Sequence, residues 1–143
     1  MSTLLDSDVL SELLRAAPAP SVLAWFAAQP AETLFVSVVA QAEMQLGASL
    51  LPAGKRRSKL EAAVGAMFSE DFEGRVLPFD SAAVAAHVDI VSLRRASGHP
   101  ISQFDAQIAA IARQNGAKLA TRNVDDFENC GISVVNPWAM PAD

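Results

Sequence analysis

The chain has 143 residues, of which 51% are hydrophobic and 19% charged, and its formal net charge is −5. This length suits a single domain over residues 1–143, and the lack of a secretory signal or an apolar run of membrane-spanning length predicts a soluble, cytoplasmic protein with no membrane partner. Because the chain has one cysteine and two histidines, an internal disulfide and a cysteine-based zinc cage are excluded, so any metal site must use oxygen ligands.

Apolar strand-like runs alternate with longer segments of helical period. In chain order the pattern predicts a strand at 3–6, helices at 9–16 (with Asp8 as N-cap) and 21–28, a strand at 34–37, helices up to about 51 and over 54–68, a strand at 75–79, helices at 81–96 and 102–115, and strands at 118–121 and 132–135. Such alternation favours an α/β domain with a mainly parallel central sheet covered by helices.

Acidic or amide side chains occur where a metal site in such a sheet needs them. Asp6 closes the first strand, and Asn123 closes the segment that begins with the strand at 118–121. Both would lie at carboxyl ends of strands, where open α/β sheets bind ligands. Asp105 opens a predicted helix and Glu43 lies inside another. We therefore take Asp6, Glu43, Asp105 and Asn123 as candidate site residues.

Glu43 has an unusual position in its helix. Val39, Glu43, Leu46 and Leu50 share one helical stripe, which predicts that Glu43 faces inward. An ionised carboxylate is costly to bury unless a cation or strong donors compensate for the lost water. The structural alternatives are a salt bridge to an arginine such as Arg122 and a position at the rim that still reaches water.

The other two acids also have structural alternatives. Ser102 with Asp105 three residues later forms a capping-box pattern, with aspartate as a shorter substitute for the usual glutamate. Asp105 nevertheless shares a helix face with apolar residues, which would turn its carboxylate toward the sheet. Asp6, followed by Ser7 and Asp8, can also be a turn-forming residue.

Together the acids are more informative than each is alone. Mg²⁺ and Mn²⁺ take oxygen ligands, and Mg²⁺ is commonly held by a few carboxylates while it keeps several waters. Such a site suits phosphodiester hydrolysis, in which a metal polarises the phosphate and lowers the pKa of bound water. Without metal, clustered carboxylates raise one another's pKa.

Four of the eleven basic residues fall in one five-residue window: Lys55, Arg56, Arg57 and Lys59. A local positive patch of this kind can contact RNA or a protein partner although the chain is acidic overall. The alternative is a solvated helix face. Arg122 has two possible roles that the sequence leaves open, binding phosphate and neutralising the acids.

Five segments in order along the chain resemble one family, the PIN-domain ribonucleases, and within it the VapC and FitB-like toxins of toxin–antitoxin pairs. The segments are residues 5–12, 37–47, 101–110, 119–127 and 135–138. The resemblance implies an α/β/α sandwich with a mainly parallel sheet and a Mg²⁺- or Mn²⁺-dependent endoribonuclease. It also implies a cognate antitoxin that blocks the active site, an assembly that binds operator DNA through the antitoxin, and a homodimer, for which the apolar helix at 84–93 offers a surface.

The family pattern can be carried over residue by residue. Its acidic metal-binding positions match Asp6, Glu43 and Asp105. Ser7 matches the hydroxyl residue that orients the first acid, and Asp8 stands where asparagine is common, which adds a carboxylate. The fourth acidic position falls on Asn123, whose amide oxygen can coordinate a metal but cannot act as a base. Asp126, three residues later, is a candidate for the missing charge.

Two other functions compete with this interpretation. A haloacid-dehalogenase-type phosphatase is suggested by Asp6 and Asp8 after a strand, but that motif requires threonine or valine where this chain has Leu10, and no convincing catalytic lysine is present. The second competitor is a catalytically degenerate PIN-fold module that binds RNA or protein, which Asn123 keeps open. Loss of metal-dependent cleavage in Asp6→Asn would exclude it.

Overall fold

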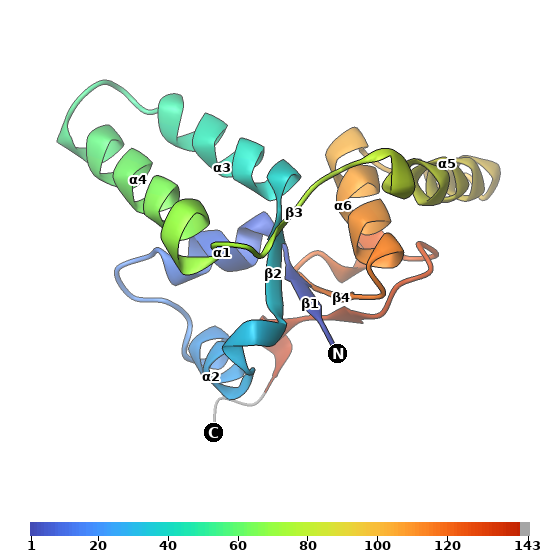
Figure 1. Ribbon diagram of the computed structural model, residues 1–143, viewed down its shortest axis with the longest axis horizontal. Coiled ribbons are helices and arrows are strands. Elements are labelled where there is room, and N and C mark those ends of the chain that lie inside the picture. The colour runs from blue at the N-terminus through green and yellow to red at the C-terminus, as the bar shows by residue number, and fades with distance from the viewer. Residues whose placement is uncertain (141–143) are drawn as a thin grey trace.

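The computed structural model describes residues 1–140 and contains five strands and six α-helices (Figure 1). The strands are β1 (Thr3–Leu5), β2 (Leu34–Ser37), β3 (Val76–Leu77), β4 (Lys118–Ala120) and β5 (Val134–Val135). The helices are α1 (Ser7–Leu13), α2 (Pro20–Ala28), α3 (Val38–Ser49), α4 (Lys55–Ala66), α5 (Ser81–Ala96) and α6 (Gln103–Gln114). Short helical turns lie at Ala31–Thr33, Met67–Asp71, Val124–Phe127 and Pro137–Ala139.

All the strand pairs of the sheet are parallel, and the strand order is β3-β2-β1-β4-β5. The first strand is therefore the central one: Thr3 and Leu4 pair with Leu34 and Phe35 of β2, and β1 pairs on its other side with β4. Parallel strands bring their carboxyl ends to one edge. The predicted parallel α/β sheet is confirmed.

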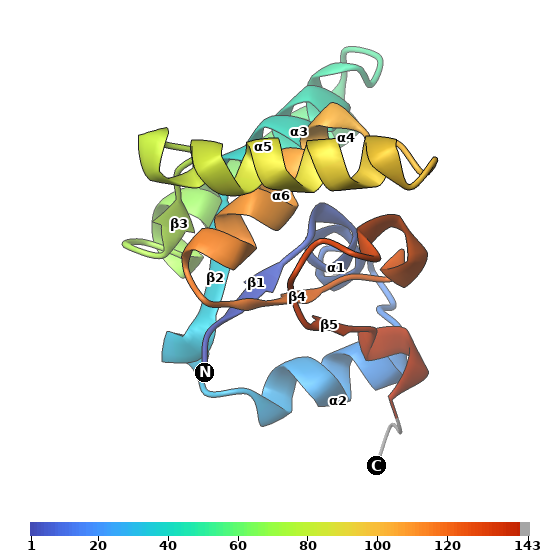
Figure 2. The ribbon, with the colours of Figure 1, turned by 90° about the vertical axis from the view of Figure 1, so that its right-hand side faces the viewer.

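Helices cover both faces of this sheet, which gives an α/β/α sandwich (Figures 1 and 2). Leu5 and Ala120 point into a core formed with α1, α2 and α4, whereas Leu4 and Leu119 point into a second core formed with α5 and α6. This alternation follows from the two-residue period of a strand, and strands covered on both sides read as continuous apolar runs.

The predicted limits of several elements are wrong by a few residues. The first helix begins at Ser7 and ends at Leu13, and its N-cap is Asp6, whose side chain accepts a hydrogen bond from the Ser7 amide. The sequence had suggested Asp8 as the cap and residues 9–16 as the helix. The strand ends one residue earlier than predicted, and Asp6 is the residue that both closes β1 and caps α1. Beyond α4, the helix continues as a π-turn over Met67–Asp71.

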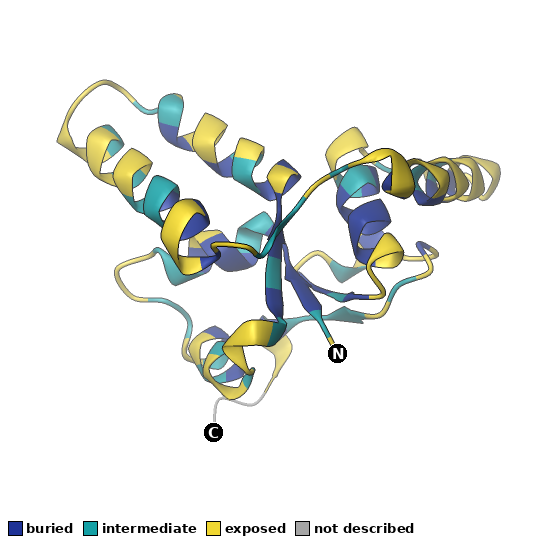
Figure 3. Cartoon of the chain, in the orientation of Figure 1, coloured by how far each residue is buried: buried dark blue, intermediate teal, exposed yellow. Residues whose placement is uncertain are grey.

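The apolar stripe assigned to α3 is also wrong beyond its first turn. The buried face of α3 consists of Val39, Ala40, Met44 and Ala48, whereas Leu46 and Leu50 are 54% and 75% exposed. Helix α3 pairs with α4 to form an arm that projects from the sheet, and its outer side is solvent-exposed (Figures 1 and 3). Glu43 is half-buried at the border of the two sides.

None of the helices within residues 1–140 combines the length and the apolar character needed to cross a bilayer.

Candidate metal centre

Four carboxyl groups lie at the edge of the sheet where the strands end, and each comes from a different position in the secondary structure. Asp6 follows β1, Asp8 lies in the first turn of α1, Glu43 lies on α3, and Asp105 lies in the first turn of α6. The pKa of Asp6 is raised in part by Asp8 and Glu43, and the pKa of Glu43 in part by Asp105 and Asp8. The structure thus brings the three predicted acids, with Asp8, into one electrostatic cluster.

Asp6 is the most buried of the four, with 6% of its surface exposed. One oxygen, Oδ1, accepts from the backbone amide of Ser7 at 2.8 Å, and Oδ2 accepts from the hydroxyl of Thr121 at 2.8 Å. Burial, followed by the nearby Asp8 carboxylate, raises the pKa of Asp6 to about 7, although both hydrogen bonds oppose this rise. The carboxyl group is therefore fixed in direction but short of positive charge.

Thr121 is a site residue that the sequence reasoning missed. Its side chain is fully buried, and its hydroxyl lies 2.8 Å from Asp6 Oδ2 and 3.2 Å from Asp8 Oδ2. Because a hydroxyl has one proton, it cannot satisfy both carboxylates at once. The available signal was a hydroxyl residue immediately after β4, at the ligand-binding edge of the sheet.

Asp8 links α1 to the segment that follows β4. Its Oδ2 accepts from the backbone amide of Arg122 at 2.9 Å and lies 3.4 Å from Nδ2 of Asn123. The other oxygen, Oδ1, is buried and finds no hydrogen-bond partner among the described residues. Burial is the largest cause of the raised pKa of Asp8.

Glu43 and Asp105 are half-buried on facing helices. Burial, and then the charge of Asp105, raises the pKa of Glu43, whose Oε1 is buried without a partner in the described part of the chain. Burial is also the main cause of the raised pKa of Asp105. The backbone amide of Asp105 donates to Ser102 Oγ at 3.2 Å, so Ser102 is the helix cap that the sequence predicted. An open cavity of about 360 Å³ lies between Glu43 and the segment 102–105.

The candidate site residue Asn123 and the predicted supporting residues Ser7 and Asp126 have roles that differ from one another. Ser7 gives its backbone amide to Asp6, whereas its side chain lowers the pKa of Glu43. Asn123 is exposed and donates its side-chain amide to Asp8. Asp126 is exposed, and its charge contributes to the raised pKa of Asp105.

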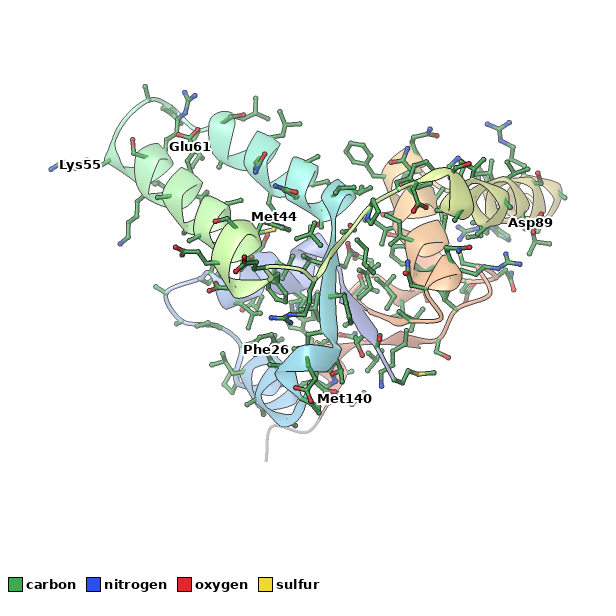
Figure 4. All side chains as sticks on the ribbon, viewed as in Figure 1. Phe26, Met44, Lys55, Glu61, Asp89 and Met140 are labelled. Carbon is green, nitrogen blue, oxygen red and sulfur yellow. The ribbon has the colours of Figure 1, made fainter. Side chains whose placement is uncertain are left out.

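The basic residues of α4 lie away from the acids, whereas Arg122 lies beside Asp8 and its positive charge lowers the pKa of Asp8. Lys55 stands at the outer end of the α3–α4 arm, with Arg56 and Lys59 exposed on the same helix (Figure 4). Arg57 pairs with Glu61 at 3.4 Å. The guanidinium of Arg122 lies 5.0 Å from the ring centre of Trp138.

The predicted alternative for Glu43, a salt bridge with Arg122, is not found. The ion pairs within residues 1–140 join other side chains: Arg15 with Glu12, Arg57 with Glu61, and Arg113 with Asp89. The four carboxyl groups therefore lack a basic side chain in ion-pair contact anywhere in the described chain.

These residues fit a hydrated divalent cation. Within residues 1–140, no three acidic, histidine or cysteine side chains already surround a single point at coordinating distance. Mg²⁺ does not require such a cage, because it keeps several of its waters and is often held by one or two carboxylates. The set of oxygen donors, the two buried unpaired oxygens of Asp8 and Glu43, and the raised pKa values all indicate that positive charge belongs here.

A groove of about 470 Å³ opens beside this centre, between α1, α3 and α4. Ser7 and Glu43 line one part of it, and Leu14, Met44 and Val64 give the rest an apolar lining. Figure 4 shows Met44 on the inner side of the α3–α4 arm. The metal centre and an apolar docking surface are therefore continuous.

The buried guanidinium of Arg94 supports the other side of the centre. Its Nε donates to the carbonyl of His99 at 2.6 Å, and its Nη1 donates to the carbonyls of Asp126 and Glu128 at 2.8 and 3.0 Å. Arg94 thus ties α5 to the segment after β4 and to the loop that leads into α6.

The fold and the cluster of acids at the edge of its sheet define a class. Residues 3–131 match the PIN domain family, and the chain belongs to that family. The resemblance inferred from five sequence segments is confirmed, and the haloacid-dehalogenase alternative is wrong because the PIN domain accounts for nearly all of the chain.

Relatives place the chain more narrowly among VapC and FitB-like proteins. It is 40% identical over 134 residues to the VapC ribonuclease Y4jK of Sinorhizobium fredii, which covers 94% of this chain and 96% of the relative. It is 36% identical to toxin FitB of Neisseria gonorrhoeae, over 94% and 97% of the two chains. The solved structure of FitAB bound to an IR36 DNA fragment contains a chain that superposes with a TM-score of 0.90 at 36% identity, covering 97% of each.

Proposed function

We propose that this chain is a Mg²⁺- or Mn²⁺-dependent endoribonuclease that acts as the toxin of a toxin–antitoxin pair. The observation that carries the proposal is the group of carboxyl oxygens at the sheet edge that have no basic partner in the described chain. Membership in the PIN family and similarity to a VapC ribonuclease and to toxin FitB support the same activity.

In this mechanism Asp6, Glu43 and Asp105 hold the cation. When bound, a divalent ion supplies a Lewis acid for the phosphate and lowers the pKa of a coordinated water. Ser7 and Thr121 fix the direction of the Asp6 carboxylate through the two hydrogen bonds of 2.8 Å. Such fixation keeps the ligand from rearranging during the reaction, which is how outer partners tune a metal site.

The groove beside the centre suits a protein partner. Its apolar lining from Leu14, Met44 and Val64 can receive apolar side chains, while Glu43 at its edge offers a negative charge to a basic one. We infer that a cognate antitoxin occupies this groove and covers the acids. Binding of the pair to operator DNA through the antitoxin follows from the similarity to FitAB, which was solved with a DNA fragment.

A homodimer is part of the same proposal. Val84 and Val88 lie four residues apart on one face of α5 and are each about half exposed, which leaves a small apolar patch on that helix. Size measurement of the antitoxin-free protein, with Val88→Asp as the disrupting variant, tests this surface: a monomer for the wild type overturns the dimer and leaves the nuclease proposal intact.

The activity is tested by cleavage of a panel of structured RNAs with Mg²⁺, Mn²⁺ or EDTA, using purified, antitoxin-free protein. Asp6→Asn and Asp105→Asn should abolish cutting. Asp125→Asn is the matched control, because Asp125 is an exposed acid of the neighbouring turn and makes none of the site contacts. Melting curves confirm that each variant is folded.

The alternative of a degenerate binding module predicts a different result. If the wild type neither cuts RNA nor gains melting temperature with metal, the metal centre is not functional and the proposal fails. If it gains melting temperature without cutting, the metal site holds and the substrate assignment fails.

A further inference from the structure

We propose that Asp8 supplies the fourth carboxylate of the metal centre and that Asn123 is its hydrogen-bond partner rather than a metal ligand. This inference deepens the proposed function and rests on it. It assigns the fourth charge to the first turn of α1, not to the segment after β4, where the sequence had suggested Asn123 or Asp126.

The geometry of the pair determines which group is free for a cation. A carboxylate only accepts hydrogen bonds, so the amide that meets Asp8 Oδ2 at 3.4 Å must present its NH₂ group. The amide oxygen of Asn123, the only atom of that side chain able to bind a cation, is then turned away from Asp8. Asn123 therefore holds the carboxylate in place and does not replace it.

The two oxygens of Asp8 have unequal surroundings. Oδ2 receives the backbone amide of Arg122 at 2.9 Å, the Thr121 hydroxyl at 3.2 Å and the Asn123 amide. Oδ1 is buried with no partner in the described chain. An unpaired buried oxygen costs free energy, and a cation or a water bound to it would remove that cost. One oxygen thus anchors Asp8, and the other has no donor in the described chain.

Asp8 also acts on the other acids. Its negative charge contributes to the raised pKa of Asp6, of Glu43 and of Asp105. Asp126 contributes only to that of Asp105, and its side chain is exposed. Asp8 thus acts on all three predicted ligands, whereas Asp126 acts on Asp105 alone.

The pair can be exchanged to test the assignment. The double variant Asp8→Asn with Asn123→Asp moves the carboxylate from position 8 to position 123. The number of carboxylates stays the same, and an amide donor still faces a carboxylate acceptor across the hydrogen bond. If Asp8 served only to hold the segment after β4 in place through its hydrogen bond with the Arg122 amide, Asp8→Asn would leave Mn²⁺ binding unchanged. In Asp8→Asn the amide oxygen still accepts from the Arg122 amide, so this hydrogen bond survives that substitution while the charge is lost.

The experiment measures Mn²⁺ binding by titration calorimetry on antitoxin-free protein, with RNA cleavage as a second readout. Asp8→Asn should weaken Mn²⁺ binding by roughly 10-fold or more, the size typical for a group supporting a metal site. The exchanged double variant should return to within about threefold of the wild type, because the charge is restored. Asp126→Asn, the competing position, should weaken binding less than Asp8→Asn does. Asp125→Asn is the matched control and should leave the affinity unchanged, because Asp125 is an exposed acid that makes none of the site contacts.

The single variant Asn123→Asp tests the assignment even where Asp8→Asn fails to fold. It places two carboxylates face to face, so it should melt at a lower temperature without metal. In the matched variant Asn123→Ala, Mn²⁺ affinity should stay within about threefold of the wild type, whereas a loss of roughly 10-fold or more would make Asn123 a metal ligand and overturn the assignment.

Three results would overturn the assignment: wild-type affinity in Asp8→Asn, a double variant as weak as Asp8→Asn alone, or a loss confined to Asp126→Asn. Failure of the wild type to bind Mn²⁺ at all would instead overturn the proposed function, and Asp8 with it.

Discussion

Two buried acids at opposite ends of α1 differ sharply although their exposure is the same. Asp6 and Glu12 are each 6% exposed. Glu12 accepts from the backbone amide of Ala19 at 2.8 Å and from Arg15 at 3.2 Å, and the Ala19 hydrogen bond is the largest cause of its lowered pKa. Burial instead raises the pKa of Asp6 to about 7. Asp6 lies deep in the fold, where desolvation is the largest cause of its raised pKa, whereas the Glu12 carboxylate lies nearer the surface and has strong donors. Depth and partners together therefore decide whether the pKa of a carboxyl group rises or falls.

The difference separates a structural acid from a functional one. Glu12 links α1 to the start of α2 through its hydrogen bond with the Ala19 amide. Its negative charge is compensated by the positive charge of Arg15. Asp6 is held by two neutral donors and faces other carboxylates. A buried charge left without a counter-charge marks a place where an external cation is expected. Substituting each acid in turn tests whether Asp6 is functional and Glu12 structural.

The largest expected effect is on cleavage. Asp6→Asn should reduce RNA cleavage at least about 100-fold, because it removes a metal-binding charge from the centre of the cluster. Glu12→Gln should change cleavage less than about threefold, since Glu12 contacts no site residue by hydrogen bond. Initial rates with Mn²⁺ at neutral pH measure both. Equal losses in the two variants would show that Asp6 has no role in cleavage that Glu12 lacks.

Thermal stability should depend more on Glu12 than on Asp6, the reverse of the order expected for cleavage. Glu12→Ala leaves the Ala19 amide without its acceptor and should lower the melting temperature by about 5 °C. Asp6→Asn should not lower it, because the substitution removes a carboxylate whose ionised form is disfavoured by burial. Thermal melts without metal test this difference, and a larger loss in Asp6→Asn would contradict it.

The pH dependence of stability should have opposite signs for the two residues. The pKa of Asp6 is about 7 in the folded chain and near 3.8 when unfolded, so between these values the folded state holds a proton that the unfolded state has lost. The Asp6 contribution to stability therefore falls as pH rises to about 7 and is constant above it. The pKa of Glu12 is lowered from 4.5, so its stabilisation is present above that value and is lost as pH falls through the folded pKa.

Melting temperatures of the metal-free wild type minus those of Asp6→Asn, taken from pH 5 to pH 8, isolate the first contribution. A difference that does not change with pH would exclude the raised pKa. Mn²⁺ competes with protons for the carboxylate, so the metal-induced rise in melting temperature should grow over the same window.

A smaller effect is expected from Thr121→Val. The Thr121 hydroxyl lowers the pKa of Asp6, so its loss should raise that pKa further and move the midpoint of the pH–cleavage profile upward by about half to one unit. Thr33→Val is the matched control, since the Thr33 hydroxyl is bonded only to the carbonyl of Pro30. A profile that keeps its midpoint would remove Thr121 from the site.

The smallest effect on RNA cleavage and binding is expected from the exposed, unpaired basic residues of α4. Replacing Lys55, Arg56 and Lys59 by glutamine should weaken RNA binding and reduce the slope of log affinity against log salt by about 2, if all three contact phosphates of single-stranded RNA. An unchanged slope would exclude an RNA-backbone role for the outer end of α4.

Much of the fold was predictable because local signals agreed with tertiary packing. The apolar runs of β1, β2 and β4 identify central strands, and Ser102 identifies the start of α6. The first helix was displaced because Asp6, Ser7 and Asp8 are all acceptable caps, and only the end of β1 decides among them. The face of α3 was misread because periodicity shows which residues align and not whether anything covers them, as the exposed Leu46 and Leu50 demonstrate.

The acids of the candidate site could be predicted from the sequence, whereas the hydrogen bonds that hold them could not. Position at a strand end indicated Asp6, position at a helix start indicated Asp105, and an acid on an apolar helical stripe indicated Glu43. The contacts of Thr121 and the pairing of Asp8 with Asn123 join residues more than a hundred positions apart. No local pattern reports such a pair, because the sheet order places the first strand beside the fourth.

That sheet order also sets when the site can exist during synthesis. The central strand β1 is made first, but its neighbour β4 is made near the end, and Asp6 receives its hydroxyl partner only with Thr121. A nascent chain that ends before Thr121 contains Asp6 but lacks the hydroxyl that donates to its carboxylate. The hydrogen bond between Asp6 and Thr121 can therefore form only after most of the chain has been synthesised.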